Sequence, residues 1–160
     1  MRIVSWNVNG IRAVAKKGFA ESLHSFDADI VCLQETKASI DQLSDDIVHL
    51  SGYTSYFHSA EKKGYSGTAL YTRREPLSVS FGLGNEKFDL EGRTIEADFG
   101  EFILYNIYFP NGGQGEERLR FKLDFYDCFL EKVEKQIRDG RRVGICGDVN
   151  TAHKEIDLSN

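Results

Sequence analysis

Apolar positions in this chain fall into short runs separated by polar, glycine-containing segments, a pattern typical of an α/β protein. The segment Asp29–Gln34 is almost continuously apolar, as in a strand buried on both faces. The pair Gly100-Glu101 predicts a two-residue hairpin between two later strands. The other strands are predicted over Arg2–Trp6, Thr54–Ser59, Thr68–Thr72, Ser78–Gly82, Thr94–Phe99, Phe102–Tyr108 and, as a last buried strand, Val143–Cys146.

Helical periodicity occurs in three places. A helix interrupted at Gly18 is predicted over Ile11–Lys16 and Phe19–Phe26. Residues 40–50 carry apolar side chains at helical spacing, with Ser39 as the N-cap. The longest helix is predicted over Glu117–Asp139, ahead of a glycine that ends it. Strand, helix, strand and helix at the start of the chain indicate a layered α/β arrangement.

The long helix is predicted to be amphipathic. Its opposite face mixes acids and bases, which is typical of a solvated face and argues against a nucleic-acid-binding stripe. The face that we expect to be apolar is formed by Leu119, Leu123, Tyr126, Leu130, Val133 and Ile137.

Composition limits the class of protein. The chain has 160 residues, 41% of them hydrophobic and 28% charged, which indicates one globular domain and excludes disordered, collagen-like and disulfide-rich chains. Cys32, Cys128 and Cys146 lie in apolar runs without a CxxC pair, so we expect buried free thiols in a reducing compartment. No apolar run approaches a membrane span, and no export signal follows Met1. We therefore expect a cytoplasmic, nucleoid-associated protein, or a nuclear one in a eukaryote.

The formal net charge of -5 limits which partners the protein can bind. A generic nucleic-acid binder is usually basic, so this charge argues against one. It remains compatible with a protein that meets phosphate through a divalent cation, because carboxylates gathered for a metal lower the net charge.

Polar residues that are poor strand formers end three of the apolar strands. Loops at strand ends in a crevice are where α/β sheets bind ligands. Carboxylate and amide oxygens brought together there suit Mg²⁺ or Mn²⁺ better than zinc, and metal-assisted phosphoester cleavage is the natural reaction class. Any one of these residues could equally be an ordinary turn former. The residues are Asn7 and Asn9, Gln34 and Glu35, and Asp148 and Asn150.

Six motifs, four of them of four residues and two of seven, carry a resemblance to a known family. They resemble the exonuclease III/AP endonuclease family in order and spacing over essentially the whole chain. The QETK and GYSG motifs point to the DNA-repair branch of the DNase I-like superfamily and away from inositol phosphatases and sphingomyelinases. The motifs are Trp6–Arg12, Gln34–Lys37, Gly64–Gly67, Tyr108–Asn111, Gly147–Asn150 and Ala152–Leu158.

The resemblance implies a DNase I-like four-layer α/β sandwich, with two packed sheets flanked by helices and the site at one edge between the sheets. It implies Mg²⁺- or Mn²⁺-dependent cleavage of the DNA backbone 5′ to abasic sites. A 3′-to-5′ exonuclease or 3′-phosphatase activity is expected to accompany it. The implied partner is double-stranded DNA with abasic sites or 3′ ends, bound by a monomer that does not associate with membranes.

The same resemblance implies roles for individual residues. Glu35 matches the metal-binding glutamate, and Asn7 matches the asparagine that helps to place the metal. Asp148 matches the aspartate that deprotonates the attacking water, and Asn150 matches the amide that donates to phosphate oxygens; both are also assigned to the metal site. Tyr108 matches a tyrosine at the scissile phosphate, either as a hydrogen-bond donor or as a partly ionised phenol. The implied DNA contacts are Arg12, Lys37, Tyr65 and Asn111.

Some features depart from the family pattern. Asn9 stands where some members have an aspartate, and Gln114 stands where some place an arginine that enters DNA. Family members also continue further, with an Asp-His pair near the C-terminus. We therefore expect residues 1–160 to be the N-terminal part of a single domain, with the second sheet largely missing, and to be inactive alone. Two alternatives stay open: a non-catalytic DNA- or protein-binding module, and an enzyme for phosphomonoesters or phospholipid headgroups.

Overall fold

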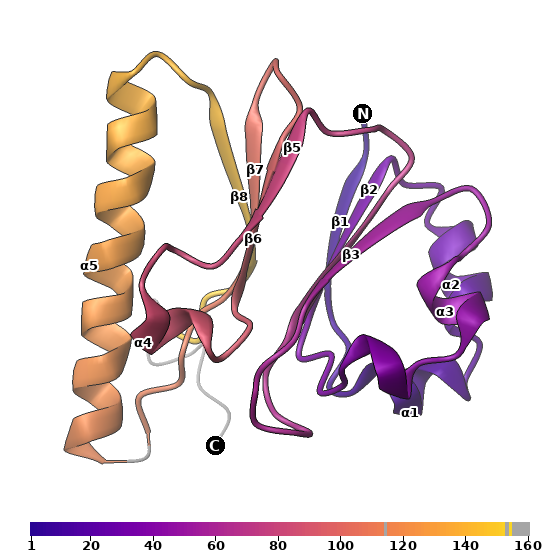
Figure 1. The fold of residues 1–160 in the computed structure, drawn as a ribbon, viewed down its shortest axis with the longest axis horizontal. Helices are drawn as coiled ribbons and strands as arrows, with labels where there is room; N and C mark the ends of the chain where they lie inside the picture. Colours follow the sequence, from indigo (N-terminus) through magenta and orange to yellow (C-terminus); the bar gives the residue numbers. More distant parts are fainter. Residues whose placement is uncertain (114, 153, 155–160) are drawn as a thin grey trace.

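A computed structural model describes residues 1–113, 115–152 and 154, and within them two four-stranded sheets lie face to face (Figure 1). The first sheet has the order β1-β2-β4-β3, with β1 and β2 parallel. The second has the order β5-β6-β7-β8, with β7 and β8 parallel. The strands are β1 (Ile3–Asn7), β2 (Ile30–Gln34), β3 (Thr54–His58), β4 (Thr68–Thr72), β5 (Ser78–Phe81), β6 (Thr94–Asp98), β7 (Ile103–Tyr108) and β8 (Val143–Asp148).

Helices cover the outer faces of both sheets, so the molecule has four layers (Figure 1). Three short helices and a 3₁₀ turn cover the first sheet, and α4 and α5 flank the second. This arrangement confirms the predicted two-sheet α/β architecture. The helical elements are α1 (Ile11–Ala15), α2 (Phe19–Ser25), the 3₁₀ turn Ile40–Gln42, α3 (Asp45–Val48), α4 (Glu86–Asp89) and α5 (Glu116–Arg138).

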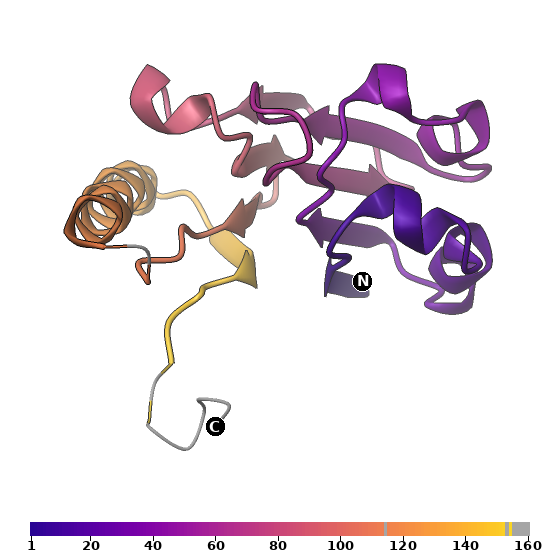
Figure 2. The same cartoon turned by 90° about the horizontal axis from the view of Figure 1, so that it is seen from below.

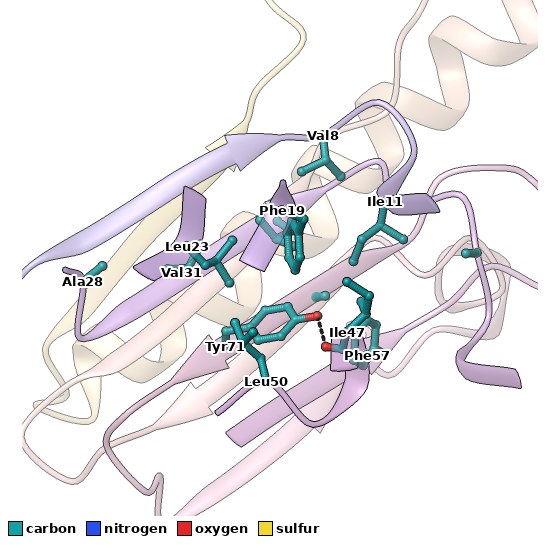
Figure 3. Close-up of a cluster of buried hydrophobic side chains, with 13 residues drawn as sticks. Val8, Ile11, Phe19, Leu23, Ala28, Val31, Ile47, Leu50, Phe57 and Tyr71 are labelled. Carbon is teal, nitrogen blue, oxygen red and sulfur yellow. Dashed lines mark hydrogen bonds between the residues drawn. The ribbon is translucent and has the colours of Figure 1, made fainter. Parts of the chain in front are cut away.

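The core between the first sheet and its helices is built around aromatic rings (Figure 3). Tyr71 on β4 meets Phe19 and Phe57 edge-on, at centroid distances of 5.7 and 5.8 Å. Its buried hydroxyl donates to the carbonyl of Ile47 at 2.7 Å, so the ring's one polar atom is satisfied. The helices are thus fixed on the sheet by packing and by a specific hydrogen bond.

The second sheet is present, contrary to our expectation that most of it would be missing. Antiparallel strands β5 to β7 form from local hairpins, and α5 returns the chain so that β8 pairs with β7 in parallel. Asn106 on β7 crosses between the sheets: its amide nitrogen donates to the carbonyls of Leu33 and Ala69, and its oxygen accepts from Gln34. The inner face of the first sheet is therefore covered.

The helix α5 buries only part of the face that we predicted: Val133 is buried and Tyr126 packs against the same core, as expected. Leu119, Leu123, Leu130 and Ile137 are all exposed, at 46 to 55% of their surface. Phenylalanines spaced four residues apart pack on the sheet instead, because Phe88 of α4 and Phe109 after β7 offer them edge-on aromatic contacts. The side chains that pack are Phe121, Phe125, Phe129 and Val133.

The burial of Val133 and the exposure of Leu130 predict unequal outcomes for two truncations on the predicted face. Val133→Ala removes buried methyl groups and should lower the free energy of unfolding by about 2 kcal/mol. Leu130→Ala removes a half-exposed side chain and should change it by less than about 0.5 kcal/mol. Urea unfolding of the two variants followed by circular dichroism measures both, and an equal or larger loss in Leu130→Ala would contradict the exposure of Leu130 in the structure.

Residues 40–50 also differ from the prediction of one helix. Leu43 and Ser44 adopt extended backbone angles, which separate the 3₁₀ turn from α3. Ser39 does precede the turn, and its backbone N–H donates to the side chain of Gln42 at 3.2 Å. The predicted break at Gly18 is confirmed, with this glycine in the left-handed region at φ 84°.

Strand β8 is an edge strand, not a buried one, because it pairs only with β7 among the described strands. Ile145 is 48% exposed, and Cys146, like Cys128 on α5, is only partly buried. Cys32 alone of the three thiols is fully buried as expected. Within the described residues, no helix is long and apolar enough to span a bilayer, since α5 is rich in charge.

Candidate active site

The loops that carry the motifs converge at one edge of the two sheets. Strands β1 and β2 run parallel, as do β7 and β8, and their carboxyl ends lie at the lower edge of Figure 1. Figure 2 shows the same edge from below, with the chain leaving β8 there. The fold therefore brings together residues that are more than a hundred positions apart in sequence.

Asn7, at the end of β1, bridges the two carboxylates of the site. Its amide nitrogen donates to Glu35 Oε1 at 2.8 Å and to Asp148 Oδ2 at 2.8 Å. The second of these hydrogen bonds crosses from the first sheet to the second. An amide NH₂ group has two hydrogens, so one side chain serves both acceptors and sets the spacing of the two acids.

Backbone hydrogen bonds join the motif loops to one another. The N–H of Gly10 donates to the carbonyl of Glu35 at 2.7 Å, which ties the WNVNG loop to QETK. The N–H of Lys37 donates to the carbonyl of Ser66 at 2.8 Å, which ties QETK to GYSG. On the second sheet, the N–H of Phe109 donates to the carbonyl of Asp148 at 2.9 Å. Each motif thus helps to fix the backbone of its neighbour.

The same loops hold strained backbone conformations. Non-glycine residues rarely adopt positive φ, and such residues tend to gather at functional sites. Within the described residues, Asp27 alone of the non-glycine residues with positive φ lies outside these loops. The others are Asn9 (44°), Glu35 (56°), Lys37 (51°), Ser66 (45°) and Asn150 (49°).

Glu35 is ionised despite partial burial. Burial raises the pKa of its carboxyl, but hydrogen bonds from Asn7, Lys37 and Tyr108 outweigh burial and leave the pKa below its usual value. The Lys37 ammonium lies 2.7 Å from Glu35 Oε2 and also donates to Asn9 Oδ1. The site therefore keeps a negative charge at neutral pH that a cation can meet.

Tyr108 ends β7 with its hydroxyl at Glu35. Burial, the charge of Glu35 and the hydrogen bond to it raise the pKa of the phenol to about 12, although Arg93 acts in the opposite direction. A phenol with this pKa is protonated at neutral pH. A protonated phenol can act as a hydrogen-bond donor, and the role of Tyr108 at a scissile phosphate stays a prediction.

Asp148, the last residue of β8, and Asn150, just beyond it, are held in fixed orientations. Asp148 Oδ1 accepts from the backbone N–H of Asn150 at 3.0 Å, while Oδ2 accepts from Asn7. The Asn150 amide nitrogen donates to the carbonyl of Phe109 at 2.9 Å, and Lys122 of α5 donates to the Asn150 carbonyl at 2.7 Å. Both side chains are therefore oriented before any substrate arrives.

The predicted DNA contacts lie at different distances from this centre. Lys37 lies at the centre, paired with Glu35. Tyr65 is connected to the centre through Arg93, which donates both to the Tyr65 hydroxyl and to the carbonyl of Tyr108. Arg12 is exposed on α1, where it borders a surface hollow beside Gln42. Asn111 is exposed, and its side chain accepts from the N–H of Gly113 in a local turn. Gln114 and most of the motif 152–158 lie outside the described residues.

Sequence reasoning missed a cluster of charged residues beside Tyr108. Arg93, only 2% exposed, pairs with Glu91, and Arg118 of α5 binds the same carboxylate through two nitrogens at 2.7 Å. Arg93 and Arg118 also both donate to the Tyr65 hydroxyl. The available signal was an arginine directly before the predicted strand that begins at Thr94, because a cation buried there requires a partner.

Glu91 makes stability depend on pH. Burial raises the pKa of its carboxyl, but Arg118 and Arg93 outweigh burial and hold the pKa below the usual 4.5. Because the folded pKa is depressed, this stabilisation is present above pH 4.5 and is lost as pH falls through the folded pKa. Glu91→Gln should therefore flatten the fall in melting temperature below pH 4.5, while Glu116→Gln, at an exposed ion pair, should not. If the melting temperatures of the wild type and of Glu91→Gln fell equally below pH 4.5, this prediction would be wrong.

The donor set at the centre consists of oxygen ligands. Glu35 and Asp148 supply two carboxylates, with amides beside them, and the described residues contain no group of three or more His, Cys, Asp or Glu side chains arranged for a metal. Such a set does not suit a fully protein-ligated zinc ion. It suits Mg²⁺, which takes one or two carboxylates and shares its shell with water and phosphate.

Comparison with known proteins agrees with this geometry. The model of the Endonuclease/Exonuclease/phosphatase family matches residues 4–160. Over its whole length the chain is 42% identical to the exodeoxyribonuclease of Bacillus subtilis, of which it covers 62%. It is 41% identical to the DNA repair nuclease APEX1 of Danio rerio and covers 52% of that protein. The chain belongs to the exonuclease III/AP endonuclease family.

Solved structures of this family share the fold. An AP endonuclease from Archaeoglobus fulgidus superposes with a TM-score of 0.84 at 30% identity, over 100% of this chain and 61% of that one. The catalytic domain of Xenopus laevis APE2 gives 0.83 at 35% identity, over 96% of this chain and 60% of that one. The exonuclease III/AP endonuclease chain described here therefore spans about three fifths of the solved relatives, and it contains both of the sheets that frame the site.

Proposed function

We propose that the protein containing this chain is a metal-dependent DNA-repair nuclease that hydrolyses the phosphodiester backbone 5′ to abasic sites. A 3′-to-5′ exonuclease or 3′-phosphatase activity accompanies it. The observation that carries this proposal is the bridge from Asn7 to Glu35 and Asp148, which holds two carboxylates of different sheets at one oxygen-rich edge. Family membership supports the substrate class, and so do the names of the relatives: an exodeoxyribonuclease, an apurinic or apyrimidinic site endonuclease and a DNA repair nuclease.

The residues present fit a hard divalent cation. Glu35, with Asp148 and the flanking amides of Asn7 and Asn150, would hold Mg²⁺ or Mn²⁺. When bound, the ion would stabilise negative charge on the phosphoryl oxygens. In the present rotamer, Asn7 turns its amide nitrogen towards both carboxylates and its oxygen towards the N–H of Asn9. In this rotamer Asn7 orients the two acids, and its amide oxygen is the atom that would contact the ion.

Different side chains of this chain have different roles in hydrolysis. Asp148, fixed at both oxygens, takes a proton from the attacking water. Tyr108, protonated at neutral pH, and the Asn150 amide donate to phosphate oxygens as charge develops on them. Lys37 and Tyr65 border this centre, and Arg12 and Asn111 extend the DNA contacts outwards on the surface.

Residues 1–160 form, in this proposal, the N-terminal part of one domain, whose remaining part completes the site. The whole protein acts as a monomer on double-stranded DNA. Its place of action is the cytoplasm around the nucleoid, or the nucleus in a eukaryote.

A nicking assay tests the proposal. The full-length protein is given duplex DNA with one tetrahydrofuran abasic analogue, with Mg²⁺, with Mn²⁺ or with EDTA. We expect incision 5′ to the analogue with either metal and none with EDTA. Inositol phosphates and sphingomyelin serve as comparison substrates. Preferential turnover of these would favour the phosphoester alternative, and a folded protein that binds DNA but cleaves nothing with either metal would favour the binding module.

A further inference from the structure

Arg93 is the most deeply buried charged side chain of the described site region, and its burial needs an explanation. It directly precedes β6 and is 2% exposed. A buried guanidinium is costly unless its donors are satisfied and its charge is paired. Here Nε pairs with Glu91, one terminal nitrogen donates to the carbonyl of Tyr108 at 2.9 Å, and the other donates to the Tyr65 hydroxyl at 3.0 Å.

The guanidinium also stacks on the rings of two predicted site tyrosines. Its carbon lies 4.6 Å from the ring centroid of Tyr108 and 5.6 Å from that of Tyr65. The backbone carbonyl of Arg93 accepts from the N–H of Tyr108 at 2.9 Å as well. Tyr108 is thus held by Arg93 at its N–H, at its carbonyl and at its ring, which leaves the phenol little freedom to turn away from Glu35.

A second cation fixes Arg93 in turn. Arg118 binds Glu91 through both terminal nitrogens and stacks on Phe121 of the same helix at 4.2 Å. Glu91 is therefore held from α5 while it holds Arg93. This chain of contacts connects the long helix of the second sheet to the hydroxyl that meets Glu35.

From these contacts we propose that Arg93 is a positioning residue, which orients Tyr108 towards Glu35 and holds Tyr65 beside it without touching the substrate. The near-complete burial of Arg93 argues against direct contact with DNA. Only a planar guanidinium can stack on the rings and donate in two directions at once, because the ammonium of lysine is a point charge on a flexible stem. The catalytic consequence rests on the proposed function, whereas the orientation of Tyr108 does not.

The test compares two identical substitutions in the full-length protein. Arg93→Lys keeps the charge and removes the fork. Arg73→Lys is the matched control, because Arg73 also stacks on a tyrosine, Tyr53 at 4.9 Å, and pairs with an aspartate at 2.8 Å, but outside the site. We expect Arg93→Lys to lower kcat for abasic DNA about 30-fold with KM changed less than about threefold, and Arg73→Lys to change neither.

A double-mutant cycle separates positioning from general damage. If Arg93 acts through Tyr108, Arg93→Lys should reduce kcat by less than about twofold in a Tyr108→Phe background. Equal losses in both backgrounds would overturn the proposal. A rise in KM with unchanged kcat would overturn it too, because that result would indicate a DNA-binding role.

A spectroscopic measurement keeps the test independent of activity. With ¹³C-labelled tyrosine, the Tyr108 ring signal, assigned from Tyr108→Phe, should shift in Arg93→Lys and stay in place in Arg73→Lys. An unmoved signal in a folded Arg93→Lys protein would contradict the proposal even if the wild type cleaves DNA. If Arg93→Lys does not fold, Arg118→Lys takes its place, because it weakens the hold on Glu91. Arg118→Lys should then shift the Tyr108 ring signal, and an unshifted signal would count against the proposal.

Discussion

Asp148→Asn should lower kcat for abasic DNA about 10³-fold while leaving the fold intact. The substitution keeps the shape of the side chain, so the amide oxygen can still accept from Asn7 or from the N–H of Asn150. It removes the proton acceptor, and general-base catalysis typically contributes 10² to 10⁴ in rate. Single-turnover nicking in Mg²⁺ measures the loss, and fluorescence anisotropy with abasic duplex DNA should show binding that is retained.

The control for this variant is the same change at a surface ion pair. Asp124 lies on α5 and pairs with Lys87, and both side chains are more than half exposed. Asp124→Asn should therefore keep wild-type activity, because exposed pairs contribute little to stability. If Asp148→Asn retained more than about a tenth of wild-type activity with unchanged metal dependence, Asp148 would not be the base, and Glu35 would become the residue to test.

The strands could be predicted because burial leaves a simple signature. In β2 and β4 every residue is buried; β2 is apolar up to its last residue, Gln34, and β4 has three apolar residues between two threonines. The hairpin at Gly100-Glu101 was equally local: the N–H of Phe99 donates to the carbonyl of Phe102 at 2.9 Å. Where structure follows from neighbours in sequence, the pattern sufficed.

The buried face of α5 was predicted only in part, with Val133 and Tyr126 correct, because the helix carries two apolar stripes. Leucines and an isoleucine form one, and phenylalanines four residues apart form the other. Sequence periodicity ranks them equally, and the choice depends on aromatic partners from distant segments. Phe109 meets Phe125 and Phe129 edge-on at 5.7 and 5.4 Å, contacts that hold the phenylalanine stripe against the sheet.

The centre of the candidate site could be predicted from its motifs, whereas its support could not. Asn7, Glu35 and Asp148 end strands whose carboxyl ends share one edge, so their meeting follows from the topology. The contacts of Arg93 depend on where the loop before β6 crosses the end of β7. No spacing in the sequence encodes that crossing, and a lone arginine beside a strand has many structural explanations.

Gly147 is the position where fold and site are most tightly coupled, and Gly147→Ala should lower the free energy of unfolding by about 4 kcal/mol or more. This glycine pairs with Ile107 between β8 and β7, directly before Asp148. Its φ is +144°, and a Cβ would lie 1.8 Å from the carbonyl oxygen of Ile107 and 2.8 Å from the carbonyl carbon. These are backbone atoms of a paired strand, so the neighbouring strand itself would have to move.

Gly140→Ala is the control that separates the steric clash expected at Gly147 from the free-energy cost of a positive φ alone. Gly140 has φ +80°, but nothing lies within 4 Å of an added Cβ, so this variant should lose only about 1 to 2 kcal/mol. Chemical unfolding of both variants in the full-length protein measures the difference. Because a displaced β8 also moves Asp148 away from Asn7, any folded Gly147→Ala protein should lose nicking activity in the way that Asp148→Asn does. Equal stability of the two alanine variants would show that β7 and β8 lie further apart at Gly147 than the structure places them.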